Sequence, residues 1–575
     1  MSIPRPEYPR PQMVRDAWLN LNGAWEFAID QGRSGRDRGL VTAPLGGEIL
    51  VPFCPESRLS GVGNTDFMAA VWYRRAFTLP EAWRGMRLLL HFGAVDYEAE
   101  AWVNGVSAGT HRGGFSSFTF DITDLVQPGE NILTVCAEDD TRSPLQPGGK
   151  QSPWYASRGC HYTRTTGIWQ TVWLEPVPQT YLARPKITPD LENGCVYLEA
   201  PVVGDAAGLT VAATATLDGD SVGQGAARVS AHGARLRLPL ARVAAWAPGS
   251  PTLYDLTLTL TGPDGEIDRV GSYFGLRSLD WRGPAILLNG APVFQRLILD
   301  QGFYPDGIFT APSDAELRAD IERSQAMGFN GARLHQKVFE ERFLYWADTL
   351  GYLVWGEMAS WGLDVANPAA LERFQTEWLE ILARDYSHPA IVGWCPFNET
   401  VAWQDREVLR QTYRLTKAID ATRPVIDASG YVHVETDVYD SHDYDQNPDT
   451  FAARHAPFAD GGEPFRNHPK ADAPYRGQPY FVSEYGGIWW NPGQRDAQAW
   501  GYGNRPAGAD EFLARYRGLT DALLDHPRMC GFCYTQLTDV EQEVNGLYTD
   551  DRQPKFDPAV MRAITARTAK IEGGE

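Results

Sequence analysis

The chain has 575 residues, enough for three or more domains of ordinary size. Hydrophobic residues make up 43% of the composition and charged residues 22%, which is typical of a folded protein and excludes a largely disordered one. The net charge of −21 argues against nucleic acid or an anionic membrane as partner, because both would repel the protein.

The cysteine pattern and the first residues indicate a reducing compartment. The seven cysteines are irregularly spaced, and the C-x-x-C pair Cys530 and Cys533 has no second pair beside it. We therefore expect free buried thiols rather than a disulfide framework or a zinc site. No apolar segment typical of a signal peptide follows the N-terminus, and no apolar run has the length of a membrane span. These features predict a cytoplasmic protein.

Residues 1–180 have the pattern of an all-β domain. Short apolar runs, such as residues 71–77 and 86–92, alternate with turn signals. Asn104-Gly105 lies between apolar residues and is typical of a two-residue hairpin turn. Many short strands at regular spacing predict a β-sandwich.

Residues 181–277 continue the β pattern with smaller side chains. Apolar and polar residues alternate cleanly over 253–260, and Pro263-Asp264-Gly265 is a hairpin turn signal. The span has about the length of an immunoglobulin-like sandwich, which we expect here.

From residue 278 to 575, helical patterns alternate with short apolar strands. Ser313 and Glu316 form a capping-box signal for a first helix. Further helices are expected at 339–350, 369–385 and 404–420, and strands at 293–299, 329–334, 352–355, 390–394, 424–426, 436–440, 479–483 and 530–536. About eight strands in this order predict a (β/α)₈ barrel. Residues 441–478 are expected to form a long loop.

Polar side chains follow several of these strands, where a barrel of this kind carries its catalytic groups. Glu399 and Glu484 come directly after the fourth and seventh strands, and Glu357 follows the third. A carboxylate there is costly unless it is paired or hydrated, and a structural ion pair is the alternative for each one. Two such residues would face each other across the barrel mouth. A separation of about 5–5.5 Å would suit a retaining glycosidase, and about 6.5–9.5 Å an inverting one.

Other chemistries lack their motifs. The sequence contains no nucleophile elbow around Ser483, no phosphate-binding loop and no zinc-protease motif. His442 and Asp443 alone are a weak metal signal. We expect neither a metal nor a cofactor.

The sequence resembles family 2 of the glycoside hydrolases, which contains β-galactosidases, β-glucuronidases and β-mannosidases. Asn398-Glu399, preceded by His388-Pro389-Ala390, is similar to the acid/base motif of that family, and residues 483–486 are similar to its nucleophile motif. Similar segments in the two preceding domains are residues 19–27, 71–75, 103–105, 120–123, 166–174, 246–248, 253–254 and 274–277. The resemblance covers nearly the whole chain and implies an N-terminal jelly-roll β-sandwich, an immunoglobulin-like β-sandwich and a catalytic barrel.

The resemblance also implies roles for individual residues. Glu399 would be the acid/base and Glu484 the nucleophile of a retaining exo-acting enzyme. Asn398 would bind the sugar 2-hydroxyl, Arg333 would keep Glu484 ionised, and Tyr444 would hydrogen-bond Glu484. Substrate contacts are also expected from strand-end or nearby side chains, namely His335, His442, Asp300, Trp489 and Asp539.

Some positions depart from the family pattern and bear on the sugar. The stretch Asn545-Gly546-Leu547 lacks the lysine with which family glucuronidases bind the sugar carboxylate, which disfavours glucuronidase activity. His335 is displaced relative to the usual Arg-x-x-His spacing, and the eighth strand has no tryptophan to form a sugar platform. A β-galactosidase is then the best single expectation, with a β-mannosidase, a β-glucuronidase or a furanosidase as alternatives.

A carbohydrate is the expected partner, and a homo-oligomer is possible. A hypothesis of a different class is a non-catalytic carbohydrate-binding protein, which the presence of both glutamates opposes. The N-terminal domain is expected to support the barrel, and its loop 147–151, with Lys150, could reach the rim of the active site.

Overall fold

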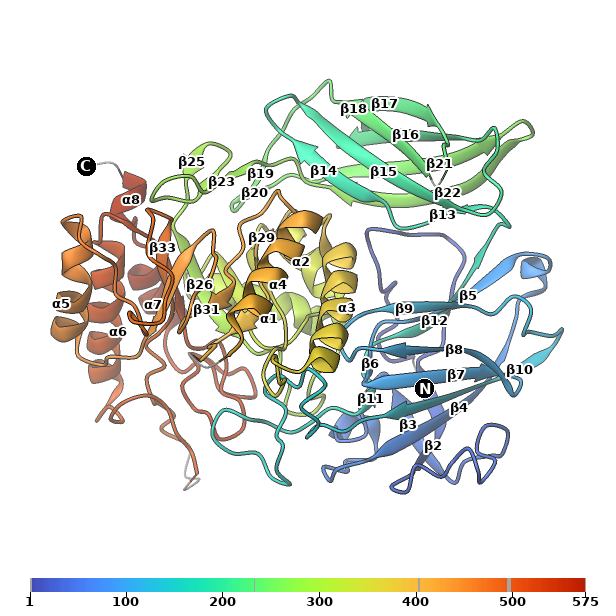
Figure 1. Ribbon diagram of the computed structural model, residues 1–575, viewed down its shortest axis with the longest axis horizontal. Coiled ribbons are helices and arrows are strands. Elements are labelled where there is room, and N and C mark those ends of the chain that lie inside the picture. The colour runs from blue at the N-terminus through green and yellow to red at the C-terminus, as the bar shows by residue number, and fades with distance from the viewer. Residues whose placement is uncertain (1–2, 232, 402–403, 494–497, 574–575) are drawn as a thin grey trace.

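A computed structural model describes residues 3–231, 233–401, 404–493 and 498–573. Figure 1 shows a blue sandwich at the N-terminal end, a green sandwich above it, and a barrel that runs from yellow to red. This three-part architecture confirms the predicted fold class.

The N-terminal sandwich has two antiparallel sheets, with strand orders β1-β12-β5-β9 and β3-β2-β4-β10-β7-β8. Asn104 and Gly105 turn β7 into β8 with φ values of 53° and 81°, as the Asn-Gly signal predicts. The elements of this domain are β1 (Leu19–Asn20), β2 (Gly23–Ile29), β3 (Gly47–Val51), η1 (Arg58–Ser60), β4 (Ala70–Thr78), η2 (Glu81–Trp83), β5 (Arg87–Phe92), β6 (Val95–Asp96), β7 (Glu98–Val103), β8 (Val106–Arg112), β9 (Phe118–Asp121), β10 (Glu130–Glu138), β11 (Gly167–Ile168) and β12 (Val172–Val177).

The second sandwich packs the sheet β17-β16-β21-β22 against strands β13, β14, β15 and β18. The predicted alternation is clear in β21, where Tyr254, Leu256, Leu258 and Leu260 are buried in the core between the sheets. Its elements are β13 (Tyr181–Leu182), β14 (Lys186–Asp190), β15 (Cys195–Val203), β16 (Thr210–Leu217), β17 (Asp220–Arg228), β18 (Gly233–Pro239), β19 (Trp246–Ala247), β20 (Ser250–Pro251), β21 (Tyr254–Gly262) and β22 (Gly265–Phe274).

The barrel is a curled parallel sheet in the order β29-β28-β27-β26-β34-β33-β32, and the short parallel pair β30-β31 lies between its two ends. Its strands are β26 (Gln295–Asp300), β27 (Gly331–Leu334), β28 (Leu353–Glu357), β29 (Ile391–Cys395), β30 (Phe397–Asn398), β31 (Ala428–Ser429), β32 (Tyr439–Asp443), β33 (Tyr480–Tyr485) and β34 (Met529–Tyr534), preceded by a small sheet of β23 (Leu279–Asp280), β24 (Leu287–Leu288) and β25 (Ala291–Pro292). The helices are α1 (Asp314–Ala326), α2 (Glu341–Leu350), α3 (Pro368–Asp385), α4 (Arg406–Ile419), α5 (Pro448–Ala459), α6 (Ala509–Leu524), α7 (Pro558–Thr565) and α8 (Lys570–Gly573).

Two expectations for the barrel need correction. The strand expected at 424–426 is reduced to one bridge between Val425 and Trp394, and the chain forms the short β31 instead. The segment 441–478 is not a continuous loop, because α5 lies within it. The Asn447 side chain caps α5 by accepting from the Asp449 N–H at 2.9 Å, and proline occupies the first turn, where its missing N–H costs nothing.

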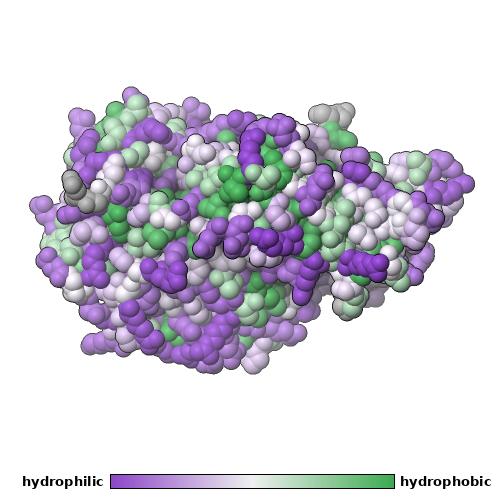
Figure 2. All heavy atoms as spheres, turned by 90° about the horizontal axis from the view of Figure 1, so that it is seen from above, coloured by the Kyte–Doolittle hydropathy of each residue, from purple (hydrophilic) through white to green (hydrophobic). Residues whose placement is uncertain are grey.

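All seven cysteines are unpaired, and burial raises the pKa of the Cys530 and Cys533 thiols on β34. Neither thiol is therefore poised to react. The face of the molecule in Figure 2 is mostly hydrophilic, with apolar side chains gathered near its centre. Within the described part of the chain, we find no helix with the length and apolarity needed to cross a bilayer.

The N-terminal sandwich is fastened to the open end of the barrel by a glycine loop. The N–H groups of Gly148 and Gly149 donate to the Trp361 carbonyl at 2.9 and 3.2 Å. Nearby, the Phe115 N–H donates to the Glu377 carboxylate on α3 at 2.7 Å, on the side of the barrel that faces this domain in Figure 1. The two glycine bonds fix the loop 147–151 against the barrel segment at Trp361, and the Phe115 bond holds the domain against α3.

This docking predicts that Gly149→Ala is destabilising. Gly149 has a φ of 58°, and a Cβ there would overlap the Gln336 carbonyl oxygen. Strain of about 1–3 kcal/mol at φ > 0 is then added to a clash that only movement of the loop relieves. Thermal unfolding should show a clear loss of Tm, and limited proteolysis should cut the loop 147–151 faster.

Gly63→Ala is the matched control, because Gly63 has a φ of 64° with open space around its missing Cβ. An equal loss of Tm in both variants would show that the loop is not clamped against the barrel.

Candidate active site

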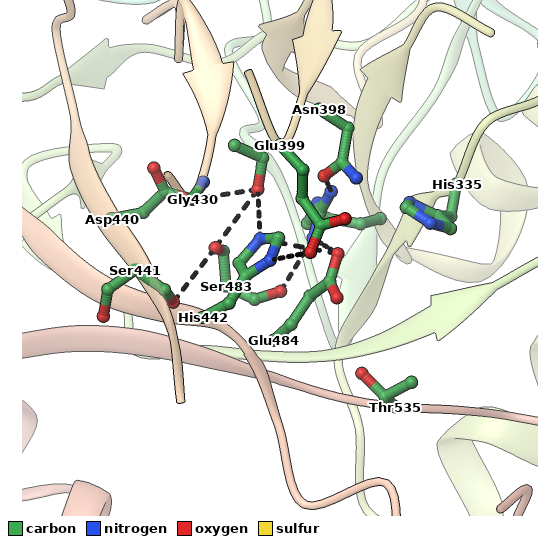
Figure 3. Close-up of polar contacts among 12 residues, drawn as sticks. His335, Asn398, Glu399, Gly430, Asp440, Ser441, His442, Ser483, Glu484 and Thr535 are labelled. Carbon is green, nitrogen blue, oxygen red and sulfur yellow. Dashed lines mark hydrogen bonds and ion pairs between the residues drawn. The ribbon is translucent and has the colours of Figure 1, made fainter. Parts of the chain in front are cut away.

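The two predicted carboxylates meet at the open end of the barrel. Glu399 follows β30 and Glu484 lies in β33, and one carboxylate oxygen of each is within 4.8 Å of the other. Figure 3 shows the two side chains directed toward the same point. Glu399 adopts a left-handed φ of 51°, and its N–H donates to the Ser429 carbonyl at 2.9 Å. Backbone strain of this kind is typical of functional positions.

Arg333, in β27, connects the acidic groups of the site. Its Nη1 donates to Glu484 Oε1 at 3.1 Å and to the Ser483 carbonyl at 2.8 Å. Its Nη2 donates to Glu357 Oε2 at 2.7 Å and to Asn398 Oδ1 at 3.1 Å. The side chain is fully buried, so one fixed cation orients both Glu484 and Asn398.

The Tyr444 hydroxyl gives Glu484 a second donor. It donates to Glu484 Oε2 at 2.5 Å and lies 3.0 Å from Thr535 Oγ1. Its ring stacks on Tyr502, with centroids 3.5 Å apart and planes 4° from parallel. Both Glu484 oxygens therefore accept a hydrogen bond, which fixes the carboxylate plane.

His442, in β32, lies between the two carboxylates, as Figure 3 shows. Its Nδ1 is 2.9 Å from Glu399 Oε1, and its Nε2 is 3.4 Å from Glu484 Oε1 and 3.1 Å from Ser429 Oγ. Burial opposes a charge on His442, but the negative charges of Glu484 and Glu399 outweigh burial and raise the pKa of the imidazole.

The surroundings hold Glu484 in its ionised form. Burial alone would raise the pKa of this carboxyl, but the charges of His442 and Arg333 lower the pKa well below its usual range. Glu357 behaves similarly: burial opposes ionisation, yet Arg333 lowers the pKa of Glu357 to about 2. Glu484 is therefore an anion at neutral pH.

Asn398 keeps a free donor. Its Oδ1 accepts from Arg333, which orients the amide, while its buried Nδ2 has no hydrogen-bond partner within the described residues. An unpaired buried N–H group costs about 1–3 kcal/mol, and a bound hydroxyl would remove this cost.

The other side chains predicted to bind substrate have no described contact with Glu399 or Glu484, and their polar groups bond to other parts of the protein. His335 Nδ1 is 3.0 Å from Glu357 Oε1, so His335 is linked to the site through Glu357. Asp300 accepts from the Gly302 N–H at 2.8 Å, and Asp539 pairs with Lys555 at 2.6 Å. Trp489 is half-buried, and its backbone N–H donates to Tyr502. No contact described for Asp300, Asp539 or Trp489 reaches Glu399 or Glu484, and their substrate roles stay predictions.

Several residues of the site were not expected from the sequence. Ser429 links His442 to Asp440 and Ser483, with bonds of 2.9 Å to Asp440 Oδ2 and 3.1 Å to Ser483 Oγ. Tyr502 supports Tyr444 from the segment after the seventh strand. None of these side chains follows a predicted strand directly, so no sequence signal selected them.

The donor atoms of Glu399, His442 and Glu484 lie within 4.8 Å of one another, as the ligands of a metal ion do. Arg333 and Tyr444 already donate to Glu484, however, and the Arg333 cation would repel a metal. The arrangement suits a different chemistry, in which a carboxylate kept ionised lies beside a second, more exposed carboxyl group. This is the layout for attack and proton transfer at one anomeric carbon.

Three family models match the chain in order. They are the glycosyl hydrolases family 2 sugar-binding domain at residues 62–148, the family 2 domain at 180–277, and the family 2 TIM barrel domain at 311–569. The chain belongs to glycosyl hydrolase family 2. It is a glycoside hydrolase, as the sequence resemblance predicted.

Curated family 2 relatives include β-glucuronidases. The protein is 26% identical to the β-glucuronidase of Paenibacillus borealis over 461 residues, which cover 73% of this chain and 74% of the relative. It is 27% identical to the β-glucuronidase of Canis lupus familiaris over 471 residues, with 73% and 69% coverage.

Solved structures show the same fold over nearly the whole chain. The Bifidobacterium dentium β-glucuronidase complexed with coumarin-3-O-glucuronide has a TM-score of 0.81 and 21% identity, covering 97% of this chain and 98% of that one. A β-galacturonidase from Eisenbergiella tayi bound to glycerol has a TM-score of 0.76 and 19% identity, covering 98% of each chain. At these identities the similarity establishes the fold alone.

The contacts of Glu484 predict the effect of Tyr444→Phe on the pH profile. Losing the hydroxyl removes a hydrogen bond that favours the ionised form, so the pKa of Glu484 rises. For glycoside hydrolysis that needs Glu484 as an anion, the acidic limb of kcat/KM then moves to higher pH. We expect kcat/KM at its optimum to fall about 10- to 100-fold, the value of a hydrogen bond to a charged group.

Tyr516→Phe is the control, because it removes a buried hydroxyl that bonds Thr565 at 2.6 Å, away from Glu484. An acidic limb that moves equally in both variants, or in neither, would disprove the role of the Tyr444 hydroxyl.

Proposed function

We propose that the protein is a retaining exo-β-glycosidase that removes a terminal sugar by double displacement. The observation that carries this proposal is the approach of the Glu399 and Glu484 carboxylate oxygens to within 4.8 Å. This spacing suits a nucleophile and an acid/base at one anomeric centre, and it leaves too little room for the water molecule that an inverting pair must hold.

In the first step Glu484 is the nucleophile. Its ionised oxygen bonds to the anomeric carbon as the bond to the leaving oxygen breaks, and Glu399 gives its proton to that oxygen. The leaving group departs as an alcohol, and the sugar stays on Glu484 as an ester. Arg333 and Tyr444 hold the attacking carboxylate in a single plane.

In the second step Glu399, now a carboxylate, takes a proton from water. The water oxygen bonds to the anomeric carbon and the ester bond to Glu484 breaks, so both carboxyl groups return to their starting states. Two displacements on opposite faces leave the product with the configuration of the substrate. Asn398 Nδ2 would donate to the sugar 2-hydroxyl, an interaction that strengthens in the transition state.

A terminal sugar is supported by the walls around the site. The loop 147–151 packs on Trp361 at one side. Asn467, in the segment beyond α5, exchanges two hydrogen bonds with the backbone of His442, the residue that contacts both carboxylates. Such walls suit a pocket for one sugar rather than an open cleft for a long chain.

The sugar itself has two candidates. A uronic acid is favoured by the names of the relatives, β-glucuronidase and β-galacturonidase, whereas the β-galactosidase expectation finds no support among them. A neutral sugar is favoured by the Asn545 side chain, which is occupied by Gln536 and Glu543 at 2.8 and 3.0 Å and offers no positive charge. Glycosides of both classes therefore belong in the first assay.

Chemical rescue distinguishes the two glutamates. Glu399→Ala should slow hydrolysis of an aryl glycoside about 10²- to 10⁴-fold, the usual contribution of an acid/base. Azide should restore turnover and give a β-glycosyl azide, because a small anion needs no base to attack the ester on Glu484. The product is identified by proton NMR.

Glu484→Gln should lose activity by at least about 10⁴-fold, and azide should not give a β-glycosyl azide. Rescue that yields the β-azide in the Glu484 variant rather than the Glu399 variant would reverse the assignment. Full activity in both variants would refute it.

A further inference from the structure

The Lys150 side chain is largely buried, and its ammonium group has no hydrogen-bond or ion-pair partner within the described part of the chain. It lies in the glycine loop of the N-terminal sandwich and is 8% exposed. No hydrogen bond, and no ion pair within 4.0 Å, joins its Nζ to any residue that the structure describes. Its nearest described contacts are the faces of two aromatic rings, Tyr162 and Trp361, each with its centroid 5.6 Å from Nζ. Lys150 Nζ is not among the fully buried atoms, so the three donors of the ammonium group face the solvent-accessible space of the site rather than acceptors of the protein.

The two rings place Lys150 at the active site. Trp361 Nε1 donates to the backbone carbonyl of Asn398 at 3.3 Å, next to the acid/base residue. The negative charges of Glu543, Glu484 and Glu399 reach Lys150 and raise its pKa against the effect of burial. The ammonium group therefore shares its surroundings with both reacting carboxylates, although it belongs to a different domain.

Glu543 is the charge that balances Lys150. It is 1% exposed, and both of its oxygens accept hydrogen bonds from neutral groups, Asn545 Nδ2 at 3.0 Å and the Tyr162 hydroxyl at 2.7 Å. No cation forms a described ion pair with Glu543, and Glu543 is the charge that acts most strongly on Lys150, so Lys150 is the positive charge that compensates it. The pair is neutral overall, and a further carboxylate placed beside it would have no cation of its own.

A purely structural lysine would close the gap and pair with Glu543 directly. The docked loop holds Lys150 back instead, because Gly149 fits against the barrel backbone and Gly148 bonds the Trp361 carbonyl. The ammonium group thus keeps its three donors available to an acceptor that comes from outside the protein.

We propose that Lys150 is a substrate-binding residue that donates to a hydroxyl group of a neutral terminal sugar. Glu543 compensates the positive charge of Lys150, so the site has no free cation for the carboxylate of a uronic acid and selects against such sugars. The inference rests on the proposed glycosidase function and names its substrate class. The N-terminal domain then completes the specificity of the site rather than only supporting the barrel.

The test compares neutral and acidic 4-nitrophenyl glycosides on the full-length protein. The neutral set contains the β-D-galactopyranoside, the β-D-mannopyranoside and the α-L-arabinofuranoside, and the acidic set contains the β-D-glucuronide and the β-D-galacturonide. We expect the wild type to hydrolyse one of the neutral set with the highest kcat/KM. Lys150→Met should lower that kcat/KM about 10- to 100-fold, because it removes a charged hydrogen-bond donor.

The Glu543→Gln variant keeps the shape of the side chain and its neighbours Asn545 and Tyr162, but it removes the negative charge that compensates Lys150. The ratio of kcat/KM for a uronide to kcat/KM for the neutral sugar should rise at least about tenfold, and Lys150→Met in the same chain should abolish the rise. Lys570→Met and Glu322→Gln, on exposed positions of α8 and α1, are the charge-matched controls and should leave the ratio unchanged. Unchanged Tm values separate these effects from unfolding.

The proposal is overturned if the wild type prefers a uronide, or if Lys150→Met leaves kcat/KM for the neutral sugar unchanged. A failure of the proposed function gives a different result, because no glycoside of either class would then be hydrolysed by the wild type.

Discussion

The site depends on the buried guanidinium group of Arg333. Two carboxylates whose oxygens lie within 4.8 Å of each other cannot both be negative in a buried site without a nearby cation. Arg333 supplies it to Glu484, while Glu357 and the Ser483 carbonyl hold the guanidinium plane. The same group orients Asn398, so the charge of the proposed nucleophile and the direction of the proposed substrate donor are fixed by one side chain. Glu399 has no contact with Arg333; it pairs with His442 at 2.9 Å and is the more exposed carboxyl of the two.

This asymmetry is how the fold separates the two glutamates chemically. Glu484 is enclosed by Arg333, Tyr444 and His442, and their charges and hydrogen bonds outweigh the cost of burial. Glu399 has a left-handed φ of 51° after β30 and is the more exposed carboxyl, which suits the proton exchange with a leaving group and with water that we propose for it. Both positions arise at strand ends of a parallel barrel, whose side chains converge at one mouth whatever their distance along the sequence.

The sequence carried the barrel and its two glutamates because strand ends and periodic helices leave local patterns. Arg333 and Tyr444 also followed from the family resemblance, and the structure places both against Glu484.

The missed features depend on contacts between distant segments. Ser429 bonds His442 only because β31 replaces a regular fifth strand, and Tyr502 meets Tyr444 by stacking rather than by any motif. The α5 helix was missed although Asn447-Pro448 is a local helix-start signal. The sequence suggested that Lys150 could reach the rim of the site, and the docked loop holds its ammonium group 5.6 Å from the centre of the Trp361 ring.

The most direct test of the account is the configuration of the first product. Proton NMR of a β-glycoside during the first minutes of hydrolysis separates the anomers before mutarotation mixes them. With Glu399 and Glu484 this close, we predict that the free sugar appears first as the β anomer, the result of two displacements. Initial release of the α anomer would mean a single displacement by water and would contradict the roles assigned to both glutamates.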